Sequence, residues 1–260
     1  MATALRDAEL KSACCRTWTN PIALLLVGDR LHPGGERTTA LTVDFLKLEP
    51  GARVLDVGCG YGSTLRLLEE RGYVPIGLDL APEAAISASS IAGSVIADAE
   101  HPPIRDGSLD GIVMECVLSL LPDKRTALSR AHKALKVGGR ISVSDVTLER
   151  PLPLPLQELT MWSTCVGGAL PTAEYVRVLH EVGYAQVDSI PLDHELIALI
   201  DQIRRRIALI EIALTARGVE LSSLGLDRNR LEALRRLAVD AVDLIRDGGA
   251  GYRLFHATKQ

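Results

Sequence analysis

The chain has 260 residues, of which 47% are hydrophobic and 24% charged, and its formal net charge is -4. This balance predicts a folded globular protein and excludes a disordered one. Lys and Arg are spread along the chain, which argues against a nucleic-acid surface, and no apolar run reaches the length of a membrane span. The charged opening segment MATALRDAELKSACC lacks a signal-peptide core, so we expect a cytoplasmic protein.

The first part of the chain, residues 1–50, is expected to form an N-terminal helical lid. Helices are predicted for the opening segment, for Pro21 to Val27 and for roughly Glu36 to Leu46. The segment GDRLHPGG between the last two is a predicted loop because of its Gly and Pro content.

From Arg53 onward, short apolar runs alternate with amphipathic segments. The runs RVLDVG, VPIGLDL, SVIAD, GIVMEC and GRISVSDV read as strands, and helical patterns separate most of them, the longest being KRTALSRAHKALKVGG. This alternation predicts an α/β fold with a doubly wound, mostly parallel sheet. Further helices are expected around Leu156 to Cys165 and from Thr172 to Val182, followed by the strand AQVDSI.

A long helical stretch separates the last two predicted strands. We therefore expect a core over residues 51–192 and 248–260, interrupted by a helical insertion over residues 193–247. The insertion is expected either to cap the active site or to pack as the face of a homodimer. The chain would end in the strand GYRLFHATK.

The glycine-rich turn VLDVGCGYGS follows the first predicted strand and precedes a helix. Glycine lets the backbone approach a ligand closely, and the N-terminus of a helix offers free N–H groups. Dinucleotide sites use a similar turn, so the turn alone does not identify the ligand.

Three aspartates at successive strand ends favour S-adenosylmethionine over NAD. Asp56 precedes the glycines, where a carboxylate can bind an ammonium group but would repel a pyrophosphate. Asp79 ends the second strand, and its carboxylate can accept hydrogen bonds from ribose hydroxyls. Asp98 ends the third strand, and its carboxylate can accept a hydrogen bond from the adenine amino group.

The motifs LDVGCGYG, GLDLAPE, ADAEHPPIRDGSLDGIVMECVLSLLPD and LKVGGRISVSD together resemble a class I S-adenosylmethionine-dependent methyltransferase. The resemblance covers roughly residues 50–150 and implies a Rossmann-like, seven-stranded sheet whose last strand is antiparallel. Carried over by position, it implies these cofactor-binding residues: Asp56, Gly58, Cys59, Gly60, Asp79, Leu80, Asp98, Ala99 and Glu115. Cys116 is expected near the cofactor but chemically inert.

The segment STCVGGALPTAEY is similar to the part of arsenite methyltransferases that carries a substrate-binding cysteine, and Cys165 matches that cysteine. The resemblance implies arsenic held by thiolates, with Cys14 and Cys15 supplying the other two sulfurs. These three cysteines are therefore the expected catalytic and arsenic-ligating residues. Two departures stand against this: no cysteine follows Cys165, and the upstream cysteines of that family lie differently from an adjacent pair.

Other interpretations of these residues remain open. Free cysteine is often simply a small buried hydrophobe. The odd total of five cysteines argues against a disulfide framework, and no His/Cys spacing fits zinc. His32 and Asp29 can act as acid/base groups if the acceptor is a hydroxyl, an amine or a carbon acid, although their loop can equally be a hinge for the lid.

Three functions therefore remain possible. The first is methyl transfer to arsenite or a related thiophilic species. The second is methyl transfer to an organic small molecule, by quinone-type C- or O-methylation similar to that of the ubiquinone/menaquinone methyltransferases. The third is binding of S-adenosylmethionine without catalysis. In each case the expected partner is a small molecule or a metalloid.

Overall fold

The structure is a computed structural model that describes residues 2–28, 31–153, 165–216 and 228–260. Its centre is a seven-stranded sheet in the order β3-β2-β1-β4-β5-β7-β6. The strands are β1 (Arg53–Val57), β2 (Val74–Asp79), β3 (Ser94–Ile96), β4 (Leu109–Glu115), β5 (Leu135–Leu148), β6 (Tyr184–Pro191) and β7 (Ala250–Lys259). Strands β1 to β5 pair in parallel, while β7 runs antiparallel between β5 and β6. The seven-stranded class I methyltransferase sheet is thereby confirmed.

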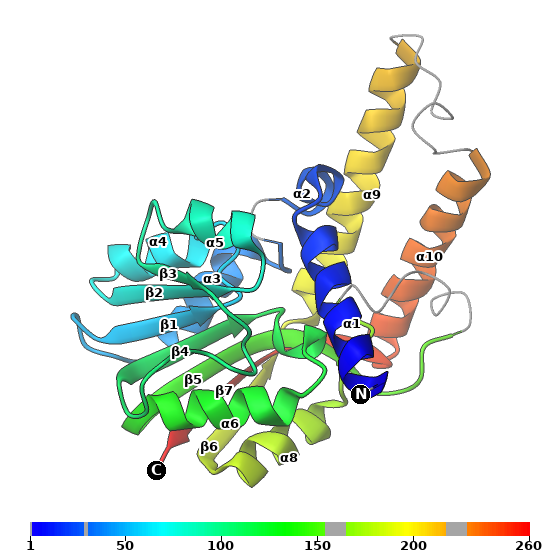
Figure 1. Ribbon diagram of the computed structural model, residues 1–260. Coiled ribbons are helices and arrows are strands. Elements are labelled where there is room, and N and C mark those ends of the chain that lie inside the picture. Colours follow the sequence, from blue (N-terminus) through cyan, green and yellow to red (C-terminus); the bar gives the residue numbers. More distant parts are fainter. Residues whose placement is uncertain (1, 29–30, 154–164, 217–227) are drawn as a thin grey trace.

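Helices cover both faces of this sheet and one of its ends (Figure 1). They are α1 (Ala2–Trp18), α2 (Pro21–Val27), α3 (Gly35–Asp44), α4 (Ser63–Glu70), α5 (Pro82–Ala88), the 3-10 turn η1 (Leu118–Leu120), α6 (Lys124–Ala134), α8 (Thr172–Val182), α9 (Asp193–Ala216) and α10 (Arg228–Arg246). Helices α6 and α8 lie on one face of the sheet, and α3, α4 and α5 lie on the other.

Local sequence signals explain where several helices begin and end. The Asp123 side chain accepts a hydrogen bond from the Thr126 backbone N–H at 2.9 Å, which caps the start of α6. Gly183 follows the end of α8 with a φ of 111°, a conformation that favours glycine. The helix expected to run through KRTALSRAHKALKVGG ends at Ala134, because the chain becomes extended at Leu135 and joins β5.

Alternate residues of the central strands build the two sides of the core. Ile112 and Met114 are fully buried on the side that α6 and α8 cover. Val113 points the other way and packs with Val43 and Leu46 beneath α3 and α4. This alternation follows from the period of two in a strand whose faces are both covered.

The N-terminal segment contributes to two different parts of the molecule. Because Val43 and Leu46 are completely buried against the sheet, α3 and the turn after it belong to the helical layer of the core. In contrast, α1 and α2 lie beyond one end of the sheet, and α2 contacts α9 (Figure 1). Of the segment expected to form a lid, α1 and α2 are thus the part placed over that end.

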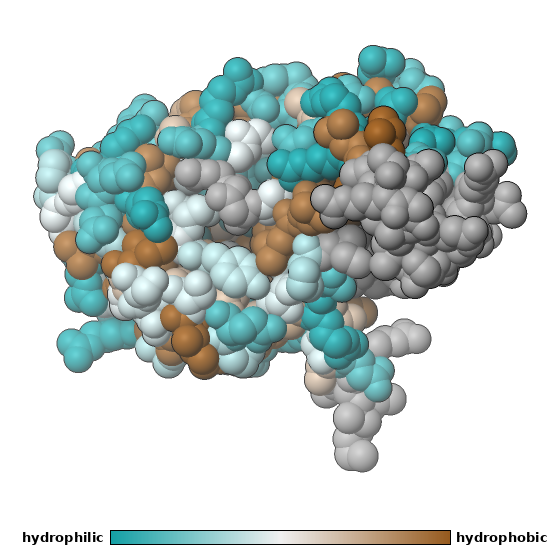
Figure 2. Space-filling model, turned by 90° about the horizontal axis from the view of Figure 1, so that it is seen from above, coloured by the Kyte–Doolittle hydropathy of each residue, from teal (hydrophilic) through white to brown (hydrophobic). Residues whose placement is uncertain are grey.

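The helical insertion forms a pair, α9 and α10, that projects away from the sheet (Figure 1). Its base packs through Leu244 and Ile245 onto the end of β7. Leu209 and Ile212 of α9 are each 65% exposed. Seen from above, hydrophobic residues lie scattered among hydrophilic ones on the surface of the molecule (Figure 2). Residues 217–227, and most of the helix expected around Leu156 to Cys165, lie outside the described residues.

Within the described part of the chain, no helix has both the length and the apolar content needed to cross a membrane.

A matched pair of valine substitutions tests the core. Val113 is 0% exposed, whereas Val137 is 80% exposed. Val113→Ala is expected to lower the free energy of unfolding by about 2 kcal/mol, because it removes buried methyl groups and leaves a cavity. Val137→Ala should change it by less than about 0.5 kcal/mol. Urea unfolding followed by circular dichroism measures both, and equal effects would contradict this packing.

Candidate functional site

A cavity of about 1120 Å³, including its open mouth, lies at the ends of β1, β2 and β4. Helix α1 covers it from one side, and the glycine-rich turn after β1 borders it from below. All nine residues expected to bind the cofactor line this cavity: Asp56, Gly58, Cys59, Gly60, Asp79, Leu80, Asp98, Ala99 and Glu115. A space large enough for a ligand is therefore present at the strand ends where the sequence predicts the cofactor site.

The turn after β1 requires glycine at the position that approaches the segment following β4. Gly58 has a φ of 74°, and a Cβ at this residue would lie 2.3 Å from a methyl carbon of Val117. Gly60 has a φ of 51°, and its N–H donates to the Asp79 carboxylate at 2.8 Å. The turn thus brings backbone rather than side chains to the cavity wall.

Asp79 is fixed at the end of β2 by backbone donors. Its carboxylate accepts the N–H of Gly60 at 2.8 Å and that of Ala81 at 2.8 Å. Burial raises the pKa of Asp79, although these hydrogen bonds oppose that rise. The carboxylate is therefore held in one orientation at the position where ribose hydroxyls were expected.

Two further carboxylates in the cavity have buried oxygens without a partner. The side-chain atoms Asp56 Oδ2 and Glu115 Oε1 are buried and accept no hydrogen bond. Burial raises the pKa of Asp56 well above its ordinary value, and the neighbouring Glu115 and Asp79 raise it further. Buried polar groups usually have partners, so this site is complementary to a cationic ligand such as an ammonium group. These orphaned atoms fit S-adenosylmethionine, which carries two positive centres.

His32 lies in the network that holds Glu115. Thr64 Oγ1 donates to Glu115 Oε2 at 2.8 Å, and Thr39 Oγ1 lies 3.3 Å from the same oxygen. His32 Nε2 is 3.1 Å from Thr39 Oγ1 and 3.8 Å from Glu115 Oε1. His32 is thus buried beside the cofactor region, while Asp29 lies outside the described residues. Sequence reasoning missed both threonines, since nothing in their local pattern marks them.

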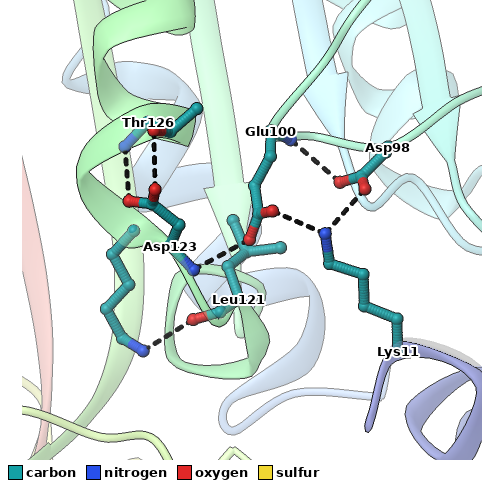
Figure 3. Close-up of polar contacts among 7 residues, drawn as sticks. Lys11, Asp98, Glu100, Leu121, Asp123 and Thr126 are labelled. Atoms are coloured by element: carbon teal, nitrogen blue, oxygen red, sulfur yellow. Dashed lines mark hydrogen bonds and ion pairs between the residues drawn. The ribbon is translucent and has the colours of Figure 1, made fainter. Parts of the chain in front are cut away.

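Lys11 of α1 connects the lid to the acidic end of the cavity (Figure 3). Its Nζ lies 2.6 Å from Asp98 Oδ2 and 2.6 Å from Glu100 Oε2. Glu100 Oε1 accepts the N–H of Asp123 at 2.8 Å, which ties the same cluster to the start of α6. Asp98, expected to accept the adenine amino group, therefore also binds α1. Sequence reasoning missed Lys11 because it lies 87 residues from Asp98.

The ionisation of this pair follows from the ion pairs and from burial. Burial lowers the pKa of Lys11, but the hydrogen bonds to Asp98 and Glu100 outweigh it and raise that pKa overall. Burial raises the pKa of Asp98, but the Lys11 hydrogen bond and the Glu100 backbone N–H outweigh it and lower that pKa overall. Both groups are charged at neutral pH.

The two adjacent cysteines of α1 line the cavity at different ends. Burial raises the pKa of Cys14 to about 11, and the nearby Cys165 and Cys15 thiols add to this. Burial also raises the pKa of Cys15, with further contributions from Asp79 and Glu83. Cys14 therefore lies toward Cys165, whereas Cys15 lies toward the ribose end of the site.

The remaining cysteines occupy separate environments, and none of the five cysteines, all of which lie in the described residues, forms a disulfide. Cys59 packs with Leu65 and Ala88 beneath α4, as a small hydrophobe would. Cys165 is 7% exposed and its thiol donates to the carbonyl oxygen of Cys116 at 3.5 Å. The structure thus packs Cys165 against Cys116, and Cys116 lines the same cavity as Cys14.

A second, apolar cavity lies between the helical insertion and the sheet. Val146 of β5 and Val166 line it on one side, and Ile200 of α9 and Ala241 of α10 line it on the other. Val146 and Val166 pack in the same cluster as Cys165. The apolar cavity is therefore adjacent to the thiols.

Comparison with known proteins agrees with this architecture. Residues 55–143 match the methyltransferase domain family. An arsenite methyltransferase of Halobacterium salinarum is 30% identical over 162 residues, which cover 57% of this chain and 41% of that protein. An arsenite methyltransferase of Aquipseudomonas alcaligenes is 30% identical over 200 residues, which cover 68% and 58%. The chain thus spans about half the length of these relatives.

The structure of Haemonchus contortus phosphoethanolamine N-methyltransferase 2 in complex with S-adenosyl-L-methionine superposes with a TM-score of 0.77. The two chains share 18% identity over 96% of this chain and 60% of the other. Residues 55–143 thus form a methyltransferase domain, and the glycine turn with the three carboxylates around it fits S-adenosylmethionine as its cofactor.

Proposed function

We propose that the chain transfers a methyl group from S-adenosylmethionine to arsenite or a related thiol-bound metalloid. The observation that carries this proposal is the position of Cys14 and Cys15 on α1 in the wall of the cavity that the cofactor carboxylates line, with Cys165 packed behind that wall against Cys116. The two arsenite methyltransferases that resemble the chain support the same acceptor. A cytoplasmic setting, in which thiols stay reduced, would suit this chemistry.

The cofactor would be held by the carboxylates that line the cavity, two of which have an oxygen without a hydrogen-bond partner. Asp56 and Glu115 would face the ammonium group, and Asp79 would accept the ribose hydroxyls. When bound, S-adenosylmethionine supplies an electrophilic sulfonium methyl group, which an arsenic lone pair can take to form an As–CH₃ bond while the sulfur leaves as a neutral thioether. The protein's part is to hold the metalloid at attack distance.

Capture of the metalloid by the thiols needs no separate general base. Trivalent arsenic is a soft centre that prefers sulfur ligands. At neutral pH the Cys14 thiol is protonated, because its pKa is raised to about 11. For each thiol that reacts, an S–H bond and an As–OH bond break, an As–S bond forms, and a water molecule leaves. The protonated state of the thiols therefore suits an acceptor that arrives as a neutral hydroxide.

A second candidate acceptor is an organic small molecule. The apolar cavity beside Cys165, lined by Val146, Ile200 and Ala241, would accommodate an apolar group under the helical insertion. Residues 193–247 would then act as a cap whose base borders the site. His32, beside Glu115, is the group within reach that could exchange a proton with a hydroxyl or amine acceptor.

Helix α1 would act as the lid of either site. It carries Cys14 and Cys15 on one side of the cavity and is tied to β3 and α6 through Lys11. Substrate entry would require Lys11 to release Asp98 and Glu100, and closure would restore both ion pairs. The lid and the cofactor site therefore share Asp98.

The first prediction concerns the cofactor. Asp56→Asn should weaken binding of S-adenosylmethionine by about tenfold or more, because a hydrogen bond to a charged group contributes about 1.5–3 kcal/mol. The thermal stability of the free protein should not fall, since the change removes a buried, unpaired carboxylate oxygen. Isothermal calorimetry and thermal unfolding measure the two effects. The exposed Asp240→Asn serves as the matched control, and unchanged binding by Asp56→Asn would contradict the assigned role.

The second prediction concerns the acceptor. Protein incubated with methyl-labelled cofactor, a thiol reductant and arsenite should yield methylated arsenicals. Cys165→Ser should lower kcat/KM for arsenite about 100-fold through lost positioning, while still binding the cofactor. Label in phosphoethanolamine or a quinone precursor, with none in arsenic, would favour the organic acceptor. Cofactor binding without transfer to any of them would indicate a binding protein.

The third prediction concerns the lid. Asp98 has a lowered pKa in the folded protein, so its contribution is present above the ordinary carboxyl pKa of about 3.9 and is lost as the pH falls through the folded value. Hydrogen exchange should therefore show α1 protected at neutral pH and progressively less protected as the pH falls below the ordinary carboxyl pKa. Lys11→Met should leave α1 unprotected throughout this range. Lys136→Met, which removes the ion pair to Asp110, is the control and should leave α1 as in the wild type.

A further inference from the structure

Helix α2 is too short to be stable without a partner. It has seven residues, Pro21–Val27, whereas isolated helices shorter than about 12–15 residues are marginal in water. Among the described elements α9 is its main neighbour, and the two helices lie side by side (Figure 1). The helical insertion therefore supplies the packing on which α2 depends.

Two side chains of α9 also bind the carbonyl groups at the end of α2. Nη1 of Arg206 donates to the carbonyl oxygen of Leu25 at 3.1 Å and to that of Leu26 at 3.0 Å. Nε2 of Gln202 donates to the carbonyl oxygen of Val27 at 3.0 Å. The last carbonyls of a helix have no partner within it, and a cation there also opposes the negative end of the helix dipole. These bonds cap α2 from a segment 175 residues away in the chain.

Helix α9 presents different faces to α2 and to the apolar cavity. Gln202 and Arg206 are four residues apart, so they lie on the same face of the helix. Ile200, Ile203 and Ile207 line the apolar cavity between α9 and α10. The polar contacts with α2 are thus separate from the apolar packing of the insertion, and either polar residue can be replaced while that packing is kept.

The first turn of α9 is joined to the core. The Asp193 carboxylate accepts the backbone N–H of Tyr252 at 2.9 Å, which joins the helix to β7. Nε of Arg37 on α3 donates to the buried Glu195 carboxylate at 2.8 Å. Because β7 and α3 are both packed in the core, these bonds make α9 a fixed support for α2.

Helix α1 is attached to the core in a different way. Near its middle, Lys11 binds Asp98 and Glu100 through ion pairs that are partly open to water, and such pairs contribute little free energy. At its end, α1 joins α2 through residues 19 and 20. The part of α1 that carries Lys11 can therefore separate from Asp98 while α2 keeps its place on α9.

We propose that Gln202 and Arg206 are positioning residues for methyl transfer, because they anchor α2 as the fixed end about which α1 opens and closes. This anchor rests on the proposed role of α1 as a lid and does not depend on which acceptor is methylated. Lys11 and Cys14 of α1 line the cofactor cavity. The helical insertion thereby determines where the lid meets the cofactor site.

Hydrogen exchange of the full chain at neutral pH tests the anchor. Arg206→Met should lower the protection of the α2 amides about tenfold or more, because it removes hydrogen bonds from a charged donor, and should lower the protection of α1 with it. Arg206→Lys keeps a cationic donor and should restore most of the protection of both helices. The adjacent, exposed Arg205→Met is the matched control and should leave both helices as in the wild type.

Lys11→Met separates the two attachments of the lid. It should make α1 exchange faster but leave α2 protected, because α2 is held by α9. Release of S-adenosylmethionine, followed by tryptophan fluorescence because Trp18 lines the cavity, should be about tenfold faster in both Lys11→Met and Arg206→Met. Urea unfolding should have the same midpoint in Arg206→Met and Arg205→Met, because α2 opens below the global transition. If Arg206→Met does not fold, Gln202→Met replaces it.

Three results would overturn the anchor. The first is an Arg206→Met variant whose α1 and α2 stay as protected as in the wild type. The second is a Lys11→Met variant that loses the protection of both helices together, and the third is an equal loss of α2 protection in Arg205→Met and Arg206→Met.

The anchor and the proposed function fail in different ways, since none of these measurements needs a methyl acceptor. A chain that shows the expected protection pattern but methylates no acceptor would contradict the proposed function and leave the anchor in place. Methylated arsenicals from a chain whose α2 is unaffected by Arg206→Met would preserve the function and exclude the anchor.

Discussion

Concentrated negative charge in a closed space is the constraint on which this site depends. Asp56, Asp79 and Glu115 converge at the ends of neighbouring parallel strands, where burial and mutual repulsion raise the pKa of Asp56 well above its ordinary value. Each carboxylate sits on a strand or turn that the core holds rigid, so the three cannot move apart. Such an arrangement is costly without a counter-charge. It therefore selects a cationic ligand and disfavours a pyrophosphate.

The same excess of acid explains how α1 is attached to the core. Besides the buried Cys14 and the partly buried Trp18, helix α1 offers Lys11, which forms ion pairs with both Asp98 and Glu100. Each ion pair that is partly open to water contributes little free energy to holding α1 in place. Such weak attachment suits a segment that has to open and close. The cofactor carboxylates lie deeper and keep their unmet bonding capacity for the ligand. The acidic side chains thus both select the ligand and hold α1 over the cavity.

The fold could be predicted from the sequence wherever local pattern and burial agree. The helix from Thr172 to Val182 was predicted with its observed bounds, because Pro171 and Gly183 flank a clear amphipathic pattern. The strand-end aspartates were also predictable, since parallel strands bring their carboxyl ends to one edge. What could not be predicted are contacts set by helix orientation, such as the reach of Lys11 to Asp98. The different surroundings of Cys14 and Cys15 also depend on the orientation of α1 and could not be predicted either.

The pairing of Cys116 with Cys165 is a consequence of packing that no linear spacing reveals, because 49 residues separate them. Both residues lie in an apolar cluster with Val146, Leu192 and Tyr252. The pKa of Cys116 is accordingly raised well above its ordinary value, by its contact with Cys165 and by burial. A thiol held in this state is a poor nucleophile toward ordinary electrophiles.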